Sequence, residues 1–321
     1  MSLLEVEGLR VRLRGADGPI PIVHGVDYRI EEGEVFGVAG ESGSGKTISM
    51  LALLGLLPEG ARVDGSVRFG GQDLLRLPRG KLREITGRDI GMVFQDPYTS
   101  LHPMLSIGRQ LTEHVRLHLG LDGRAAQRRA IELLAEVRIP DAEAALRAFP
   151  HQFSGGMRQR IAIAIALACR PKLLIADEPT TALDVTVQAG ILQLLDRLRH
   201  ENDLAVVLIT HDLGVLSAVA DRVSIFYAGR VVESGPRADV LQRPRHPYTR
   251  ALLEALPHPE LARDEPLVAI PGSPPHPGAI PSGCAFHPRC AFAIDSCRTD
   301  VPPLVPAGGR VLACPPDPFA A

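Results

Sequence analysis

The chain has 321 residues, of which 45% are hydrophobic and 22% charged, as in an ordinary soluble globular protein of one large or two modest domains. Its formal net charge of −2 and the scatter of its basic residues argue against nucleic acid as a partner. No apolar run reaches the roughly 18 residues of a membrane span, and the opening MSLLEVEGLR lacks the features of a secretory signal. We therefore expect a soluble, cytosolic chain that reaches a membrane only through partners.

The first part of the chain alternates strand-like segments with glycine turns. LLEVEGLRVRL (3–13), VDYRI (26–30) and VFGVAG (35–40) are strand-like, and the pattern becomes helical from Lys46 until Pro58 stops it. This order predicts an antiparallel sheet, then a buried strand that leads through a glycine-rich loop into a helix.

The middle of the chain is helical before buried strands return. Residues 107–148 carry apolar residues at helical spacing, which predicts a helical insert at about 96–160. IAIAIALA (161–168) predicts a buried helix, whereas LLIAD (173–177) and LAVVLITHD (204–212) predict buried strands. An amphipathic helix is expected between those two strands. The alternation predicts an α/β fold.

The glycine-rich segment GESGSGKT (40–47) fits the P-loop pattern G-x-x-x-x-G-K-[ST]. Its glycines let backbone N–H groups wrap a phosphate, and the helix N-terminus adds a positive dipole end. The Lys46 ammonium would reach the β- and γ-phosphates, and the Thr47 hydroxyl would hold Mg²⁺. The expected nucleotide-binding residues are Gly40, Glu41, Ser42, Gly43, Ser44, Gly45, Lys46 and Thr47.

Two acidic residues end the buried strand in LLIADEPT (173–180). Phosphoryl transfer needs one acid that holds Mg²⁺ and another that polarises the attacking water. Asp177 suits the first role, and Glu178 suits the second, as general base. The alternative is a strand that merely ends in acidic residues.

Together with four further motifs, these two resemble the ATPase subunit of an ATP-binding-cassette (ABC) transporter, in that family's order. The further motifs are MVFQDP with Gln95, FSGGMRQR (153–160), TALD (181–184) and ITHD with His211. The resemblance implies a P-loop NTPase core with an antiparallel β subdomain and a helical subdomain. Two positions depart from the family: Met157 replaces the commoner Gln, and Leu13 stands where an aromatic ring usually stacks on adenine.

The resemblance also implies that two such ATPases pair head to tail around ATP. The signature loop of one subunit, Ser154, Gly155, Gly156 and Met157, would face the P-loop of the other, and Asp184 would help set the interface.

The family's hydrolytic roles fall on four other residues. Asp177 with Thr47 would hold Mg²⁺, Gln95 would contact Mg²⁺ or the attacking water, and His211 would contact the γ-phosphate and Glu178.

The composition shifts after residue 235, where Pro and Gly become frequent. The segments RPRHPYTRALLEALP (243–257), IPGSPP (270–275) and GCAFHPRC (283–290) are similar to the oligopeptide/dipeptide importer branch, with nickel importers a near relative. We expect an ATPase domain over residues 1–235 and an extension over 236–321. A short helix in the extension is expected to dock through its leucines, Leu252, Leu253 and Leu256.

Four of the five cysteines, Cys284, Cys290, Cys297 and Cys314, lie in this extension. Buried free thiols explain Cys169 on its apolar helix better than they explain a cluster in a Pro-rich tail. A structural Zn²⁺ site usually has C-x2–4-C spacing, which is missing here, whereas a [4Fe–4S] cluster tolerates looser spacing. Some members of the resembled branch carry such a cluster, so the resemblance favours [4Fe–4S] over Zn²⁺. Either metal could pin a segment that cannot fold by burial.

The resemblance therefore implies an ATPase of an importer, with ATP and Mg²⁺, at the cytoplasmic face of the membrane. Its expected partners are two membrane permease subunits, a second homologous ATPase and an external solute-binding protein, with no nucleic acid. The alternatives are an ATPase for nickel or another small solute, and a soluble ABC protein unrelated to transport.

Overall fold

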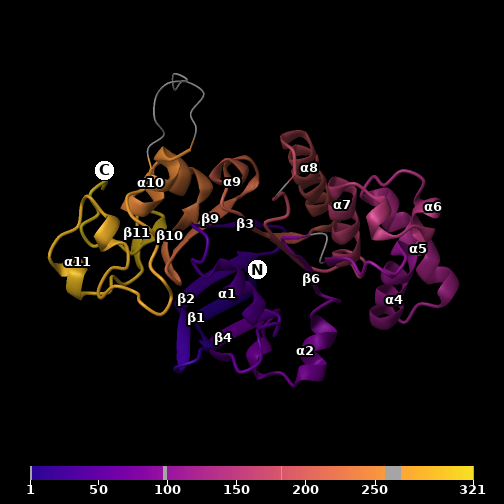
Figure 1. The fold of residues 1–321 in the computed structure, drawn as a ribbon, viewed down its shortest axis with the longest axis horizontal. Helices are drawn as coiled ribbons and strands as arrows, with labels where there is room; N and C mark the ends of the chain where they lie inside the picture. Colours follow the sequence, from indigo (N-terminus) through magenta and orange to yellow (C-terminus); the bar gives the residue numbers. More distant parts are fainter. Residues whose placement is uncertain (1, 97–99, 182, 257–268, 321) are drawn as a thin grey trace. The chain divides into compact units, whose positions relative to one another are not determined.

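The computed structural model describes residues 2–96, 100–181, 183–256 and 269–320 (Figure 1). Pro97 of the MVFQDP motif, Ala182 of the TALD motif and residues 257–268 of the extension lie outside the described residues. The chain divides into two compact units. The P-loop unit comprises residues 2–30, 36–75 and 210–321, and the helical unit comprises residues 31–35 and 76–209.

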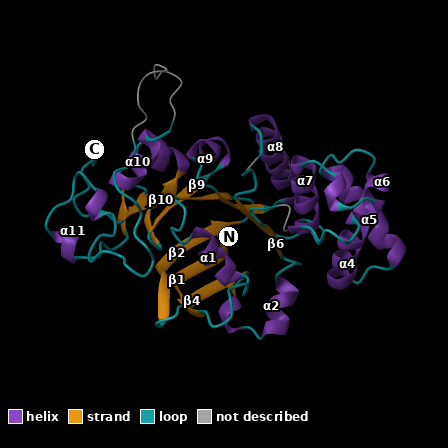
Figure 2. Ribbon diagram, viewed as in Figure 1, coloured by secondary structure: helices purple, strands orange, loops and turns teal. Residues whose placement is uncertain are grey.

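An antiparallel sheet forms the first layer of the P-loop unit (Figure 2). Its strands, in the order β2-β1-β4-β5, are β1 (Ser2–Arg14), β2 (Pro19–Glu31), β4 (Arg62–Phe69) and β5 (Gln72–Asp73). Leu4 and Val6 are buried on β1, and beyond the register shift near Gly8 the buried residues become Leu9 and Val11. The bulge keeps the apolar residues on the core face, and the predicted antiparallel β subdomain is confirmed.

A second set of strands in the P-loop unit has the order β11-β12-β10-β9-β3. The strands are β3 (Val35–Ala39), β9 (Arg222–Tyr227), β10 (Arg230–Pro236), β11 (Val305–Ala307) and β12 (Arg310–Leu312). β3 and β9 are parallel and mostly buried, which their continuous apolar runs predict, while β10 and β12 add antiparallel pairs.

The helix after the P-loop is shorter than its sequence pattern predicts. α1 (Lys46–Leu53) ends well before Pro58, because Gly55 adopts a left-handed φ of 66° that closes the helix. The expectation of a helix up to Leu57 is therefore wrong at its C-terminal end.

The remaining helices of the P-loop unit lie in its C-terminal half. They are α9 (Leu213–Val219), the π-helical turn η3 (Ala238–Gln242), α10 (Pro247–Glu254) and α11 (Ser296–Thr299), with short turns η1 (Leu74–Arg76) and η4 (His287–Arg289). Residues 269–283 contain neither helix nor strand, as their proline and glycine content predicts.

α10 docks by a different face from the expected one. Leu252, Leu253 and Leu256 are only half-buried, whereas Tyr248 and Thr249, in the first turn of the helix, have no exposed surface. The docking contact is therefore made by the N-terminal turn rather than by the leucines.

The extension is joined to β10 by main-chain pairing and by one buried carboxylate. Ser234 on β10 faces Val311 on β12 in an antiparallel register. The Glu233 side chain is fully buried and accepts hydrogen bonds from Arg310 Nη1 (2.8 Å) and from the N–H groups of Arg245 (3.0 Å) and His246 (3.1 Å). By packing, the extension belongs to the P-loop unit, while the functional boundary near residue 235 stays a prediction.

The helical unit combines three parallel strands with a group of helices. Its strands, in the order β6-β7-β8, are β6 (Ile90–Val93), β7 (Leu173–Asp177) and β8 (Ala205–Ile209). Its helices are α2 (Arg79–Ile85), α4 (Ile107–Leu119), α5 (Gly123–Glu136), α6 (Ala142–Arg147), α7 (Gly155–Ala166) and α8 (Val185–Asn202), with the turn η2 (Pro150–Gln152). Figure 1 shows α4, α5 and α6 gathered beside α7, so the predicted helical insert is confirmed.

The described part of the chain contains no helix with the length and apolarity needed to cross a membrane.

Close packing of β6 against α7 gives a stability prediction. A Cβ atom on Gly91 of β6 would lie 2.4 Å from the Ala166 carbonyl oxygen, so Gly91→Ala forces the backbone apart. We expect a loss of about 1–3 kcal/mol in the free energy of unfolding, measured by chemical denaturation.

Gly80→Ala is the matched control. Among the described residues, nothing lies within 4 Å of a Cβ built on Gly80, which is in helix α2, so this substitution should add up to about 1 kcal/mol. Equal stabilities of the two variants would contradict the packing argument.

Candidate functional site

The P-loop of the P-loop unit is closed around the ammonium of Lys46. Lys46 Nζ donates to the carbonyl oxygens of Gly40 (2.7 Å) and Glu41 (2.9 Å) and to Ser44 Oγ (3.3 Å). The side chain is buried, with 6% of its surface exposed. The loop thus already forms a ring of oxygens around a positive charge, at the start of α1.

Two glycines of this loop occupy positions that no other residue fits. Gly40 has φ of 145°, and a Cβ there would lie 2.1 Å from the Phe226 carbonyl oxygen. Gly45 has φ of 97°, and its Cβ would lie 3.2 Å from the Ile22 carbonyl oxygen. A Cβ on Gly43, in contrast, would meet none of the described atoms within 4 Å, and Ser42 beside it is exposed. The loop is therefore packed at its ends and open at its tip, where backbone amides can receive an anion.

The helical unit brings two of the predicted catalytic residues, Gln95 and Glu178, together, and Glu178 follows the predicted Mg²⁺ ligand Asp177 in the chain. Asp177, at the end of β7, is 3% exposed, and Glu178 follows it with a strained φ of 46°. Glu178 Oε2 accepts hydrogen bonds from Gln95 Nε2 and from Thr181 Oγ1, both at 2.9 Å. The Glu178 N–H donates to the Ile209 carbonyl oxygen at 2.9 Å. The backbone and the carboxylate of Glu178 are thus both held in place by hydrogen bonds.

The signature and TALD residues form the starts of two neighbouring helices. Ser154 caps α7, where its Oγ accepts the Met157 N–H at 3.3 Å, and Asp184 caps α8, where its Oδ1 accepts the Val187 N–H at 2.9 Å. A Cβ on Gly156 would lie 2.5 Å from Val187 Cγ1, so glycine is needed where these helix ends meet. Ser154 and Asp184 are both exposed.

Two further predicted positions lie in the P-loop unit. His211 lies two residues after the end of β8 and is exposed, and Leu13 is half-buried near the end of β1. Tyr28 is a core residue, 6% exposed and stacked on Phe36 with ring centroids 5.5 Å apart. Tyr28 is thus part of the core.

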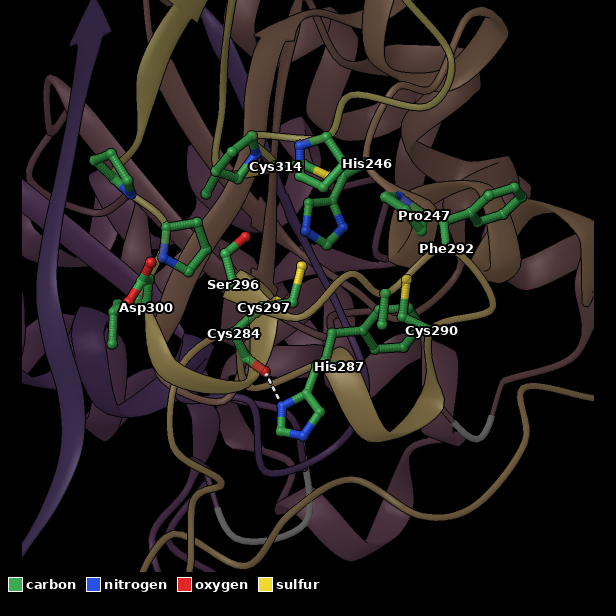
Figure 3. Close-up of a pocket in the computed structure, with 18 residues that line it drawn as sticks. His246, Pro247, Cys284, His287, Cys290, Phe292, Ser296, Cys297, Asp300 and Cys314 are labelled. Atoms are coloured by element: carbon green, nitrogen blue, oxygen red, sulfur yellow. Dashed lines mark hydrogen bonds between the residues drawn. The ribbon is translucent and has the colours of Figure 1, made fainter.

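The four cysteines of the extension line one cavity of about 220 Å³ (Figure 3). Backbone hydrogen bonds tie its walls together: the Cys284 N–H donates to the Cys297 carbonyl oxygen at 2.8 Å, and His287 Nδ1 lies 2.9 Å from the Cys284 carbonyl oxygen. Burial raises the pKa of Cys314 to about 12 and raises the pKa values of the Cys284 and Cys290 thiols. The side chains of all four cysteines are therefore neighbours around a partly enclosed space.

The four thiols give this cavity a set of soft sulfur donors. Across residues 2–96, 100–181, 183–256 and 269–320, no three His, Cys, Asp or Glu side chains are gathered closely enough to hold a metal ion. Tetrahedral Zn²⁺ needs its sulfurs within about 2.3 Å of one point. A cluster needs thiolates spread around a larger body, and four soft sulfur donors around one cavity fit that need.

His246 lines the same cavity, but its side chain is buried and hydrogen-bonded within the protein. It is 2% exposed, and its Nδ1 accepts the Tyr248 N–H at 3.1 Å. Burial lowers the pKa of His246 to about 3, against a weaker opposing effect of a hydrogen bond with the Ala313 backbone. The ring is therefore neutral and already bonded.

The sequence analysis missed a contact between the extension and the P-loop. Arg289 forms a two-point ion pair with Glu41, and the Tyr248 hydroxyl accepts the Glu41 N–H at 2.8 Å. One signal was present: an acidic residue inside a loop that binds an anion needs a nearby cation.

Comparisons with known proteins agree with these features. A family model described as "ABC transporter" matches residues 23–181, and one described as "Oligopeptide/dipeptide transporter, C-terminal region" matches residues 232–297. The oligopeptide transport ATP-binding protein OppD of Salmonella typhimurium is 46% identical over 97% of this chain and 93% of its own. The dipeptide transport ATP-binding protein DppD of Escherichia coli is 47% identical over 98% and 96%.

Solved structures give the same answer for the fold. The ATP-binding cassette MJ0796, described as a dimer in a post-hydrolysis state bound to ADP and Pi, matches with a TM-score of 0.65 and 28% identity, covering 73% of this chain and 98% of that one. The cbiO1 protein of Clostridium perfringens matches with a TM-score of 0.63 and 29% identity, covering 75% and 91%. The fold and motifs thus define an ABC-type ATPase with the P-loop NTPase architecture that the sequence predicts.

Within that class, the chain belongs to the ABC transporter ATPase family, in the branch with the oligopeptide/dipeptide transporter C-terminal region.

Burial of His246 predicts a pH-dependent stability. Above pH 6.5 the His246 ring is neutral in the folded and the unfolded chain. Below pH 6.5 the ring is protonated in the unfolded chain, but in the folded chain it stays neutral down to about pH 3. Stability should therefore fall as pH falls from 6.5 to 3, and His246→Asn should make ΔG of unfolding less steep by up to about 1.4 kcal/mol per pH unit.

His102→Asn is the control, because exposed His102 also accepts a backbone N–H two residues on, from Met104 at 3.3 Å. An unchanged slope in His246→Asn, measured by urea denaturation at several pH values, would contradict the neutral buried ring.

Proposed function

We propose that this chain is the ATP-hydrolysing subunit of an importer that carries di- or oligopeptides across the cytoplasmic membrane. The observation that carries the proposal is the likeness, over 97% and 98% of the chain, to proteins named for oligopeptide and dipeptide transport. The matched C-terminal region at residues 232–297 supports the same branch. The substrate would meet the membrane subunits and not this chain, so the likeness supports the substrate class and no finer choice.

In the P-loop unit, the proposed role of the loop is to hold the phosphates of ATP. Lys46 would exchange its contacts with loop oxygens for contacts with β- and γ-phosphate oxygens, and the open tip of the loop would offer its amides. Thr47 is a proposed Mg²⁺ ligand in this unit, and Asp177 is a proposed Mg²⁺ ligand in the helical unit. Mg²⁺ neutralises charge on the phosphates when it is bound. His211 would contact the γ-phosphate.

In the helical unit, the proposed general base is Glu178. Its carboxylate is held by Gln95 and Thr181, which fixes the oxygen that takes the proton of the attacking water. Gln95 contacts this carboxylate directly, so a shift of Gln95 would change the base. That contact supports its role as the residue that reports the ligand state to the membrane subunits.

The proposed assembly is a dimer of ATPases on two membrane permease subunits, with an external solute-binding protein. The exposed N-terminus of α7, with Ser154, Gly155, Gly156 and Met157, would face the nucleotide of the partner subunit, and exposed Asp184 would lie at the interface. The MJ0796 cassette is described as dimeric with ADP and Pi, which supports this arrangement. The chain would sit peripherally on the cytoplasmic face of the membrane.

The proposed role of the cysteine cavity is to hold a [4Fe–4S] cluster, with Zn²⁺ as the alternative. Cys284, Cys290, Cys297 and Cys314 would be its ligands, and the bound group would supply four metal–sulfur bonds that pin the loops of the extension.

Glu178→Gln tests the catalytic role. The amide has the same size but cannot take a proton, so we expect ATP binding to persist while kcat falls by at least about 100-fold. ATP affinity and phosphate release by the assembled transporter are the measurements.

Glu201→Gln is the matched control, because Glu201 is an exposed carboxylate of the same unit that pairs with Arg197 on the surface of α8. Turnover near the wild-type rate in Glu178→Gln would remove Glu178 from its proposed role.

Metal analysis tests the cysteine site. Anaerobically purified chain should contain about four irons and four sulfides, both lost in Cys290→Ser. Cys169→Ser, which changes a buried thiol outside the cavity, should keep them. One zinc without iron would favour the alternative, and neither metal would show that the cavity is not a metal site.

A further inference from the structure

We propose that the C-terminal extension positions the phosphate-binding loop through Glu41, with Arg289 and Tyr248 as positioning residues for ATP binding. The inference rests on the proposed nucleotide-binding role of residues 40–47 and goes beyond it, because it gives the extension a part in ATP affinity.

The first contact is a bidentate ion pair. Arg289 Nη1 lies 2.7 Å from Glu41 Oε2, and Arg289 Nη2 lies 2.9 Å from Glu41 Oε1. The two side chains are only 5% and 23% exposed. Two parallel charge-assisted hydrogen bonds, shielded from water, fix both the distance and the orientation of the carboxylate.

The second contact holds the backbone of the same residue. The Glu41 N–H donates to the Tyr248 hydroxyl at 2.8 Å, while the Glu41 carbonyl oxygen accepts from Lys46 Nζ at 2.9 Å. The carboxylate, the N–H and the carbonyl of Glu41 are thus all engaged. Glu41 therefore acts as the anchor of the loop rather than as a direct nucleotide contact.

Arg289 is itself held on three sides by the P-loop unit. Its Nε donates to the Pro271 carbonyl oxygen at 2.8 Å, and Nη1 lies 3.3 Å from the Tyr227 hydroxyl. The guanidinium also lies 5.8 Å from the ring centroids of Tyr227 and Phe286. A guanidinium with its donors used in fixed directions cannot follow a moving loop, so it holds the loop in place.

Charge gives the pair a second effect on ATP. A carboxylate within a loop that receives phosphates repels them, and Arg289 cancels that charge at contact distance. Loss of Arg289 would leave the carboxylate unpaired beside the phosphates. Loss of Arg289 together with the carboxylate would remove the repulsion.

This distinction defines the test, a titration of the full chain with MgATP. Arg289→Met should raise Kd about tenfold, and Arg289→Met/Glu41→Gln should recover only part of that loss, because the carboxylate no longer repels the phosphates while the loop still lacks its anchor. In the assembled transporter, Arg289→Met should raise KM for ATP and leave kcat within about twofold, because the proposed base lies in the helical unit. A merely structural loss would lower the active fraction, and thus the apparent kcat, at constant KM.

The matched control is Arg245→Met, which breaks the largely buried Arg245–Asp317 ion pair of the extension. Its Kd for MgATP should equal that of the wild type. The proposal is overturned if Arg289→Met binds MgATP normally, if Arg245→Met weakens binding as much, or if the double variant binds MgATP as tightly as the wild type. If Arg289→Met does not fold, Arg289→Lys is the alternative variant, because it keeps the positive charge but cannot form two parallel hydrogen bonds to the Glu41 carboxylate. An unchanged Kd for MgATP in Arg289→Lys also overturns the proposal.

Lys46→Ala separates this inference from the proposed function. Normal MgATP binding by Lys46→Ala would refute the nucleotide-binding role of the loop itself. Lost binding in Lys46→Ala with normal binding in Arg289→Met would refute only the role of the extension.

Discussion

The extension depends on the complete burial of one carboxylate, that of Glu233 on β10. An unpaired charge in that position would cost several kcal/mol, so the chain must bring donors to it. The donors come from the extension: the guanidinium of Arg310 and the N–H groups of Arg245 and His246. These bonds fix the start of α10, and two residues after His246 the Tyr248 hydroxyl reaches the N–H of Glu41. The geometry of the P-loop is thus linked to a buried charge on the neighbouring hairpin.

The polar contacts of the extension specify its position more than they stabilise it. Buried ion pairs recover in Coulomb energy roughly what they lose in desolvation, but a misplaced segment would leave one partner unpaired. Aromatic packing supplies the apolar part: the rings of Tyr227, Tyr248 and Phe286 lie with centroids 4.5–5.3 Å apart. A segment with so many prolines has little else to bury, and this combination explains how it can pack as part of the P-loop unit without long helices or strands.

The sequence predicts what depends on local pattern. The buried strands, the helical insert and the loop GESGSGKT are visible in apolar periodicity and glycine spacing, and the structure contains them. The end of α1 was misjudged because Gly55 stops the helix before Pro58 can. The Arg289–Glu41 pair joins residues 248 positions apart in the chain. Glu233 is a charged residue in a strand, and the sequence pattern around it does not indicate that its carboxylate is buried. Neither is encoded in local periodicity, because each is defined by a partner that only the folded chain brings near.

One turn of the extension connects the cysteine cavity with the phosphate loop. The turn η4 lies between Cys284 and Cys290, and its last residue is Arg289. His287 of this turn lines the cavity, and the ring of Phe286, the residue before the turn, packs on Tyr227 and Tyr248. Residues 284–290 thus carry the Arg289 guanidinium, and through Phe286 they pack on Tyr248, whose hydroxyl accepts the Glu41 N–H. Those two groups hold Glu41, so the shape of the cysteine loop and the shape of the P-loop are set together.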